Sequence, residues 1–498
     1  MVKNSPIILF FGVLPFLKIV LKLHDAETET APLLFYAFEK RSSIMSISLL
    51  YCIPFAGLLL SIAIVPLFAG KFWGKYYPLA VVFWSLAFII PSIIGLGGSF
   101  TVETVLDCIF NDYMTFIILL FGLYCVSSNI TIHCRLASTP KINTIFLAIG
   151  TLLSSVIGTT GASMLLLKPL LRINTRRGKK THLVVFFIFL ISNMGGCLTP
   201  IGDPPLLMGF SRGVPFFWDL KIFPILLLNM VILLTVFYLF DSHLYKKEMT
   251  PVLDHLQKGG TSFRSIASNI HVSGKHNLIF LVIIILAVIL SGYLPTLSLF
   301  QDASGATLGI HIYKDVMITY PALIEVAMIL LAALGSQKTT KRKVDKIKVF
   351  SWDPIKEVAI LFVGIFITMQ PALIILKGLG NTLTITHPWE FFAMTGVLSS
   401  FLDNTPTYLV FFTMACSMGF TTGLTTTAGV IPAIFLKAIT CGAVFAGAGT
   451  YIGNAPNMMV KNIAEERGIK MPSFFGYMAW SVGILVPVFI LDCLIFFR

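Results

Sequence analysis

Long apolar runs separated by short polar connections extend along almost the whole chain. A helix needs about 20 mostly apolar residues to cross a bilayer, and most of the runs reach that length. They predict membrane segments at residues 5–23, 45–69, 77–97, 112–134, 142–171, 183–210, 222–241, 277–294, 320–336, 355–376, 388–417, 427–460 and 473–497. The pattern therefore predicts an all-α polytopic membrane protein, with the lipid bilayer as its main partner.

Two of these runs differ from the rest in length and in their centres. Runs 142–171 and 388–417 each span 30 residues and carry Gly, Thr, Asn or Pro in the middle. We interpret both as re-entrant hairpins, the first entering from the cytoplasm and the second from outside. The alternative is one long, tilted helix in each place, which would put a basic cluster on the wrong face of the membrane.

The distribution of Lys and Arg supports this topology. With two hairpins, the connections on one face carry 23 of these residues and those on the other face carry six. Basic residues favour the cytoplasmic side, so the richer face is predicted to be cytoplasmic. This asymmetry also accounts for the net charge of +13 without a nucleic-acid partner.

Composition excludes several other classes of protein. Charged residues make up 12% of the chain and hydrophobic residues 56%, whereas soluble domains carry about 25% charged residues. A soluble enzyme, a disordered protein and a nucleic-acid-binding domain are therefore excluded. The eight cysteines form no Cys-x-x-Cys pair, and the nine histidines show no zinc-hydrolase spacing, so we expect neither an enzyme nor a bound cofactor.

The runs and their connections divide the chain into four parts. Residues 1–44 are predicted to form a signal sequence or an uncleaved anchor, followed by an external segment. Residues 45–241 form the first half of the protein and residues 320–497 the second. Between them, residues 242–319 form a cytoplasmic loop, a linker helix and an external loop.

A short motif occurs twice, once in each half. Ile201-Gly202-Asp203-Pro204-Pro205 matches Ile452-Gly453-Asn454-Ala455-Pro456 at an offset of 251 residues. Each copy interrupts an apolar run and follows a hairpin, whose centres are Gly158-Thr159-Thr160 and Asp403-Asn404-Thr405-Pro406. The order of elements is the same around both copies. We therefore predict inverted repeats at about 77–241 and 320–497, a common plan of secondary transporters.

Interrupted helices expose backbone groups that must be buried in protein or line a wet cavity. Freed carbonyls suit a cation, and helix N-termini suit an anion. We therefore place candidate ion sites where each hairpin tip meets a helix break. The candidate residues are Thr159, Thr160, Gly202 and Asp203 in the first half, and Asp403, Asn404, Thr405, Gly453 and Asn454 in the second.

Three charged residues lie inside the apolar runs, and each has a functional and a structural interpretation. Asp403 is predicted to be a cation ligand and proton acceptor, the alternative being a cap that orders the hairpin tip. Asp203 precedes a half-helix, where Asp is a favourable N-cap, so its direct role in transport is the weaker prediction. Lys437 is the candidate counter-charge inside the membrane, the alternative being a structural pair or a side chain that snorkels to the interface.

These motifs resemble those of the ion transporter superfamily, over about residues 45–497. That superfamily includes divalent anion/sodium symporters, citrate–metal transporters, ArsB-type arsenite transporters and NhaD-type sodium/proton antiporters. The chain resembles bacterial proteins described as sodium:proton antiporters, a group also described as citrate transporters. The resemblance implies a homodimer in the bacterial inner membrane, with a static scaffold and a moving transport unit.

The chain departs from the dicarboxylate symporters at both tips. These carry Ser-Asn-Thr, whereas the first tip here lacks Ser-Asn and the second has Asp403 in place of Ser. Two acids would repel an organic anion and attract a cation. We therefore predict sodium:proton antiport, with Na⁺ at Asp403, Asn404 and Thr405 and proton exchange chiefly at Asp403. The alternative is a cation-coupled citrate or dicarboxylate transporter, and a membrane-embedded enzyme or a channel has less support.

Overall fold

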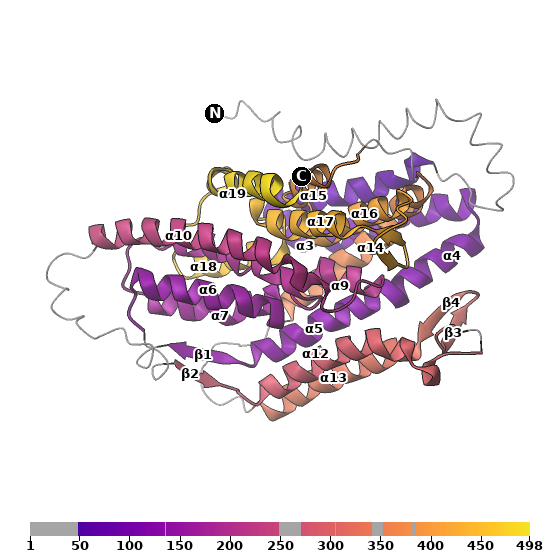
Figure 1. Cartoon of the computed structure of the whole chain (residues 1–498), viewed down its shortest axis with the longest axis horizontal. Coiled ribbons are helices and arrows are strands. Elements are labelled where there is room, and N and C mark those ends of the chain that lie inside the picture. The colour runs from indigo at the N-terminus through magenta and orange to yellow at the C-terminus, as the bar shows by residue number, and fades with distance from the viewer. Residues whose placement is uncertain (1–47, 135, 249–269, 304, 341–351, 380–384) are drawn as a thin grey trace.

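The computed structural model describes residues 48–134, 136–248, 270–303, 305–340, 352–379 and 385–498 (Figure 1). The predicted signal sequence or anchor, including run 5–23, lies outside the described residues. Within them, ten helices are long and apolar enough to cross a bilayer. The protein is therefore an all-α polytopic membrane protein, as the sequence predicts.

The first half is a series of helices interrupted at a few defined points. In chain order these are η1 (Leu49–Cys52), α3 (Ile53–Gly95), α4 (Gly98–Asp107), the π-helix η2 (Cys108–Tyr113), α5 (Met114–Ser128), α6 (Pro140–Ile157), α7 (Thr159–Ile173), α8 (Thr181–Leu190), η3 (Met194–Leu198), α9 (Pro204–Ser211), η4 (Trp218–Ile222) and α10 (Phe223–Glu248).

The remainder of the described chain is also helical. Its helices are α12 (Asn277–Tyr293), η5 (Leu294–Thr296), η6 (Ser298–Phe300), α13 (Tyr320–Thr339), α14 (Asp353–Leu379), α15 (Pro388–Ser399), α16 (Asn404–Ser417), α17 (Ala433–Ala446), η8 (Gly447–Gly449), α18 (Ala455–Glu466) and α19 (Phe474–Phe496).

Among the described residues, three antiparallel strand pairs lie in the connections between helices. They are β1 (Thr131–Cys134) with β2 (Ile270–Ser273), β3 (Gly309–Tyr313) with β4 (Val316–Thr319), and β5 (Leu424–Thr426) with β6 (Gly429–Ile431). The β1–β2 pair lies at one end of the long axis and the β3–β4 pair at the opposite end (Figure 1).

Some predicted boundaries are wrong, each for a local reason. Runs 45–69 and 77–97 are two membrane spans within α3 that meet at a kink, with non-helical backbone at Ala69 (φ −139°, ψ 52°). The second span begins at Phe68 and not at residue 77, because Lys71 and Lys75 lie inside the helix and Lys is a good helix former. Run 427–460 is not one span, because the β5–β6 pair reaches Ile431 before α17 begins.

Both predicted hairpin segments consist of two helices joined at a tip. In the first, α6 and α7 meet at Gly158, whose φ of 77° favours a residue without a side chain. In the second, α15 ends at Ser399 and α16 begins at Asn404. The alternative of one continuous helix is therefore wrong in both places.

The two helix breaks have nearly the same backbone. Asp203 precedes α9 with φ −145° and ψ 142°, and Asn454 precedes α18 with φ −149° and ψ 140°. Thr199 Oγ1 donates to the carbonyl of Ser155, as Thr450 Oγ1 does to that of Ser400. The same elements and hydrogen bonds therefore recur at the two copies of the motif.

The helices that carry the breaks are among the most deeply buried of the described helices. In α8, every residue from His182 to Leu190 is buried, and in α17 every residue from Ala438 to Ala446 is buried. By contrast, α3, α12 and α19 expose many large apolar side chains, which is typical of helices that face lipid. The breaks are thus enclosed by protein, as interrupted backbone at membrane depth requires.

Candidate functional site

The two hairpin tips meet at the carboxylate of Asp203. Thr159 Oγ1, at the start of α7, donates to Asp203 Oδ1 over 2.8 Å. Asn404 Nδ2, at the start of α16, donates to Asp203 Oδ2 over 3.0 Å. All three side chains are about 1% exposed. Each oxygen of this buried acid therefore accepts a hydrogen bond from a different hairpin.

Each tip also packs directly against the break of its own half. The amide of Thr159 donates to the carbonyl of Gly202 over 2.8 Å. In the second half, a Cβ on Gly447 would lie 2.2 Å from Asn404 Oδ1, and one on Gly453 would lie 2.9 Å from the carbonyl of Ser400. The predicted approach of tip and break is therefore found in both halves.

The capping roles of the two acids are the reverse of those predicted. Asp203 occupies the N-cap position of α9, but its side chain makes no capping hydrogen bond. An N-cap side chain accepts from the second or third helical N–H. The second residue of α9 is Pro205, which has no N–H, and the amide of the third, Leu206, donates to the Asp203 carbonyl. The prediction of a capping side chain is therefore wrong, and the carboxylate is left for the two tips.

Asp403 is the acid whose side chain does cap a helix. Its Oδ1 accepts from the amide of Thr405 over 3.0 Å, and the residue is partly exposed. Thr405 is buried, and its Oγ1 has no hydrogen-bond partner among the described residues. The contacts of Asp403 therefore fit the alternative interpretation, in which it is a cap that orders the hairpin tip. The Thr405 hydroxyl beside it is available to a ligand.

Side-chain amides join the two breaks to each other. Asn454 Nδ2 donates to Asn193 Oδ1 over 3.1 Å, and Asn193 Nδ2 donates to Asn457 Oδ1 over 2.7 Å. Asn457 in turn donates to the carbonyls of Gly447 and Thr450. Asn457 was missed as a site residue, although it directly follows the second motif copy. The network makes the two halves one continuous polar centre.

A small cavity lies on one side of this centre. Its volume is about 50 Å³. A water needs about 10–15 Å³ on this measure, so the cavity suits a few waters or a small ion. Its lining includes the whole Gly158-Thr159-Thr160 tip, the residues flanking Asp203, and apolar side chains of α5 and α14, with no charged side chain.

Lys437 lies away from these contacts. It is partly exposed on α17, ten residues before Gly447, which is about 15 Å along the helix. Within the described part of the chain it forms no ion pair of 4.0 Å or less with an acid. The structure therefore does not pair Lys437, the candidate counter-charge, with Asp403 or another acid of the described residues.

Comparison with protein families identifies the class of protein. A family described as "Putative citrate transport" matches residues 44–497. The chain belongs to this family. No curated protein matches the chain. Family membership and the ten apolar helices make the protein a multi-pass membrane transporter, and the polar centre at Asp203 is its candidate ion site.

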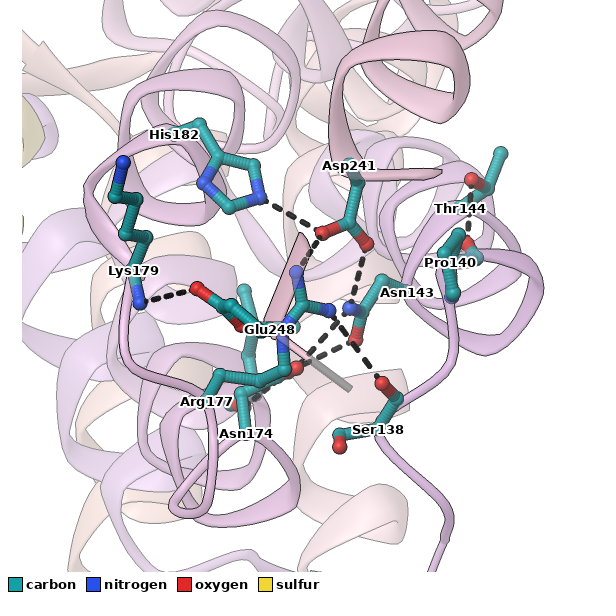
Figure 2. Close-up of polar contacts among 11 residues, drawn as sticks. Ser138, Pro140, Asn143, Thr144, Asn174, Arg177, Lys179, His182, Asp241 and Glu248 are labelled. Carbon is teal, nitrogen blue, oxygen red and sulfur yellow. Dashed lines mark hydrogen bonds and ion pairs between the residues drawn. The ribbon is translucent and has the colours of Figure 1, made fainter. Parts of the chain in front are cut away.

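This transporter also has a buried ionic cluster at the base of the first hairpin, where α6 begins and α7 ends (Figure 2). The sequence did not predict this cluster. Arg177 Nη2 lies 2.7 Å from Asp241 Oδ1, and His182 Nε2 lies 2.8 Å from the same oxygen. Asn143 in α6 donates to Asp241 Oδ2 and exchanges hydrogen bonds with Asn174 at the end of α7. The cluster joins both ends of the hairpin to α8 and α10.

Arg177→Gln is expected to destabilise the transporter by roughly 3–5 kcal/mol, because removing one partner of a buried pair leaves an uncompensated charge. Arg177 is 3% exposed and Asp241 is fully buried. Thermal unfolding of the purified protein measures the loss. Arg212→Gln is the control, because its pair with Asp112 is longer, at 3.2 Å, and partly exposed, so about 0–1 kcal/mol is expected. Equal losses in the two variants would contradict a buried clamp.

Proposed function

We propose that this transporter exchanges Na⁺ for protons in a bacterial inner membrane, and that Asp203 binds the two ions in turn. The observation that carries the proposal is the pair of hydrogen bonds from Thr159 and Asn404 to the Asp203 carboxylate. A buried acid inside a membrane protein is expensive and is usually retained for function. Here it lies where both hairpins and both breaks converge.

The surroundings of Asp203 suit a small cation. The other oxygen ligands that the site offers a cation are neutral. They include the Thr159 hydroxyl and the Gly202 carbonyl, and this carbonyl accepts a hydrogen bond from the Thr159 amide over 2.8 Å. Na⁺ binding to the carboxylate would release a proton, and protonation would release Na⁺. One group that holds either ion, but not both, is sufficient for coupled exchange.

The second hairpin tip supplies a further part of the proposed site. Thr405 Oγ1 is a buried oxygen without a hydrogen-bond partner in the described residues, and its own amide binds Asp403. We retain Asp403, Asn404 and Thr405 as ligands of Na⁺, with Asp403 in a supporting role because it also caps α16. The proposed set of ligands also includes Thr160, which lines the cavity, and two residues of the second break, Gly453 and Asn454.

The repeated motif supports an alternating-access mechanism. The matched breaks, tips and hydrogen bonds support inverted repeats with two re-entrant hairpins, the plan in which many secondary transporters hold substrate near the midplane. In this proposal, the hairpins and broken helices carry the ion past the helices that line the cavity from the other side, α5 and α14.

A citrate or dicarboxylate transporter is the second candidate, and the family description favours it. Helix N-termini at the tips and breaks attract anions. However, Asp203 already accepts the hydrogen bonds that these tips would give to a substrate carboxylate. The adjoining cavity has no basic side chain in its lining, so a tricarboxylate would find repulsion there and no counter-charge.

Proteoliposomes with an acidic interior and a trapped pH-sensitive dye test the two candidates. External Na⁺ is expected to raise the internal pH, whereas citrate at constant Na⁺ has no effect. K⁺ in place of Na⁺ is the ionic control, and protein-free vesicles give the leak. Uptake of labelled citrate without Na⁺-driven proton movement would refute antiport and establish the second candidate.

A further inference from the structure

The structure contains two buried acids at matching positions of the two halves. Asp241 in α10 and Asp492 in α19 are 251 residues apart, the same offset as Gly202 and Gly453. Both are 0% exposed. Their partners differ in charge, because Asp241 meets Arg177 and His182, whereas the hydrogen-bond partner of Asp492 in the described chain is the neutral amide of Asn229.

The hydrogen bonds of this pair lack one donor. Asn229 Nδ2 has two hydrogens. One binds the carbonyl of Ile225 over 2.8 Å, and the other is shared between Asp492 Oδ1 and Oδ2, each 2.9 Å away. Asn229 Oδ1 is buried and has no partner among the described residues. The two carboxylate oxygens therefore share a single N–H, and the amide oxygen has no donor.

One proton on Asp492 would supply the missing hydrogen-bond donor. The neutral acid can donate its O–H to Asn229 Oδ1 while its other oxygen accepts from Nδ2, which gives a reciprocal pair of hydrogen bonds. An ionised Asp492 would instead be a buried charge without a cation, which is strongly unfavourable. We propose that Asp492 and Asn229 form a proton-binding site separate from Asp203. The proton comes from water, and an O–H bond forms on the carboxylate.

The neighbouring charged groups leave this proposal intact. The titratable residues near Asp492 are Cys493 beside it and Cys441 of α17, and Cys441 in turn lies near Lys437 of α17 and Asp219 of η4. On the packed helices, Asp241 lies 12 residues along α10 from Asn229, about 18 Å away, and η8 has no titratable side chain. In the described part of the chain, no Lys, Arg or His lies within ion-pair distance of Asp492.

The site lies near the ends of both helices that form it. Asn229 is six residues from the start of α10, and Asp492 is four residues from the end of α19. These spacings correspond to about 9 Å and 6 Å of helix. The pair therefore lies near the end of the bundle where α10 begins and α19 ends.

Infrared spectroscopy of the purified transporter at neutral pH tests the proposal through the C=O stretch of protonated carboxyl groups. Asp492→Asn is expected to remove one such band, and the variant should fold because Asn resembles the neutral acid. Asn229→Leu should shift the same band, because the acceptor of the O–H is lost. Asp241→Asn is the matched control, and it should leave the band unchanged because its acid is ion-paired.

Two results would overturn the proposal. The first is a spectrum in which neither Asp492→Asn nor Asn229→Leu changes any band of a protonated carboxyl group. The second is that the band removed by Asp492→Asn also disappears from the wild-type spectrum when Na⁺ is added and returns when Na⁺ is removed, since the Asp492 site would then hold Na⁺. Neither readout requires transport, so the proposal stands or falls independently of the antiport assay.

Discussion

Asp203→Asn is expected to reduce Na⁺-driven proton movement to the background of protein-free vesicles. The amide keeps the shape of the side chain and one oxygen for Thr159, but it cannot carry a proton or a negative charge. The second carboxylate oxygen is replaced by an N–H₂ group that faces another donor, Asn404 Nδ2. In the wild-type protein this nitrogen donates to Asp203 Oδ2 over 3.0 Å. The dye assay measures the loss, and thermal unfolding verifies that the protein is folded.

Asp403→Asn is the matched comparison at the other acid. Asn is as good an N-cap as Asp, so the hydrogen bond from the Thr405 amide should survive, and exchange should fall less than in Asp203→Asn. The sequence alone predicted the opposite order. If Asp403→Asn abolishes exchange while Asp203→Asn retains it, Asp403 is the exchanging acid and the role proposed for Asp203 is wrong.

The elements that position the site follow largely from local sequence. Gly158 and the residues around Asp403 predicted two hairpin tips, and the Ile-Gly motifs predicted two breaks, because Gly and Pro close together in a span favour an interrupted helix. Helix ends in the polar connections were less predictable. Run 222–241 continues to Glu248, since Lys246, Lys247 and Glu248 are good helix formers.

The roles of the site residues depend on contacts that local sequence does not encode. Asp203 and Asn404 are 201 residues apart, and Arg177 and Asp241 are 64 apart. Arg177 was counted only as a basic residue of a connection. One local signal was overlooked, because Pro205 removes one of the two N–H groups that an N-cap side chain can use, which weakened the prediction that the Asp203 side chain caps α9.

Gly202→Ala is expected to destabilise the transporter by about 3 kcal/mol or more, since overpacking a close backbone contact strains the surrounding structure. A Cβ at this position would lie 2.2 Å from the carbonyl oxygen of Gly196. The neighbouring backbone has little freedom to move, because the Gly202 carbonyl accepts the Thr159 amide over 2.8 Å. Any shift of the break would therefore also separate Thr159 from Asp203.

Two further glycine variants make this prediction specific to the break. Gly453→Ala is the matched change in the second half, where the Cβ would lie 2.6 Å from the Gly447 carbonyl, and a similar loss is expected. Gly483→Ala in α19 is the control, because no atom lies within 4 Å of its Cβ and Ala stabilises a helix interior by roughly 0.5–1 kcal/mol over Gly. Thermal unfolding of the three variants gives the comparison. If Gly202→Ala and Gly483→Ala unfold at the same temperature, the close packing of Gly202 on Gly196 is contradicted. The geometry that holds Asp203 between the two hairpin tips is then contradicted as well.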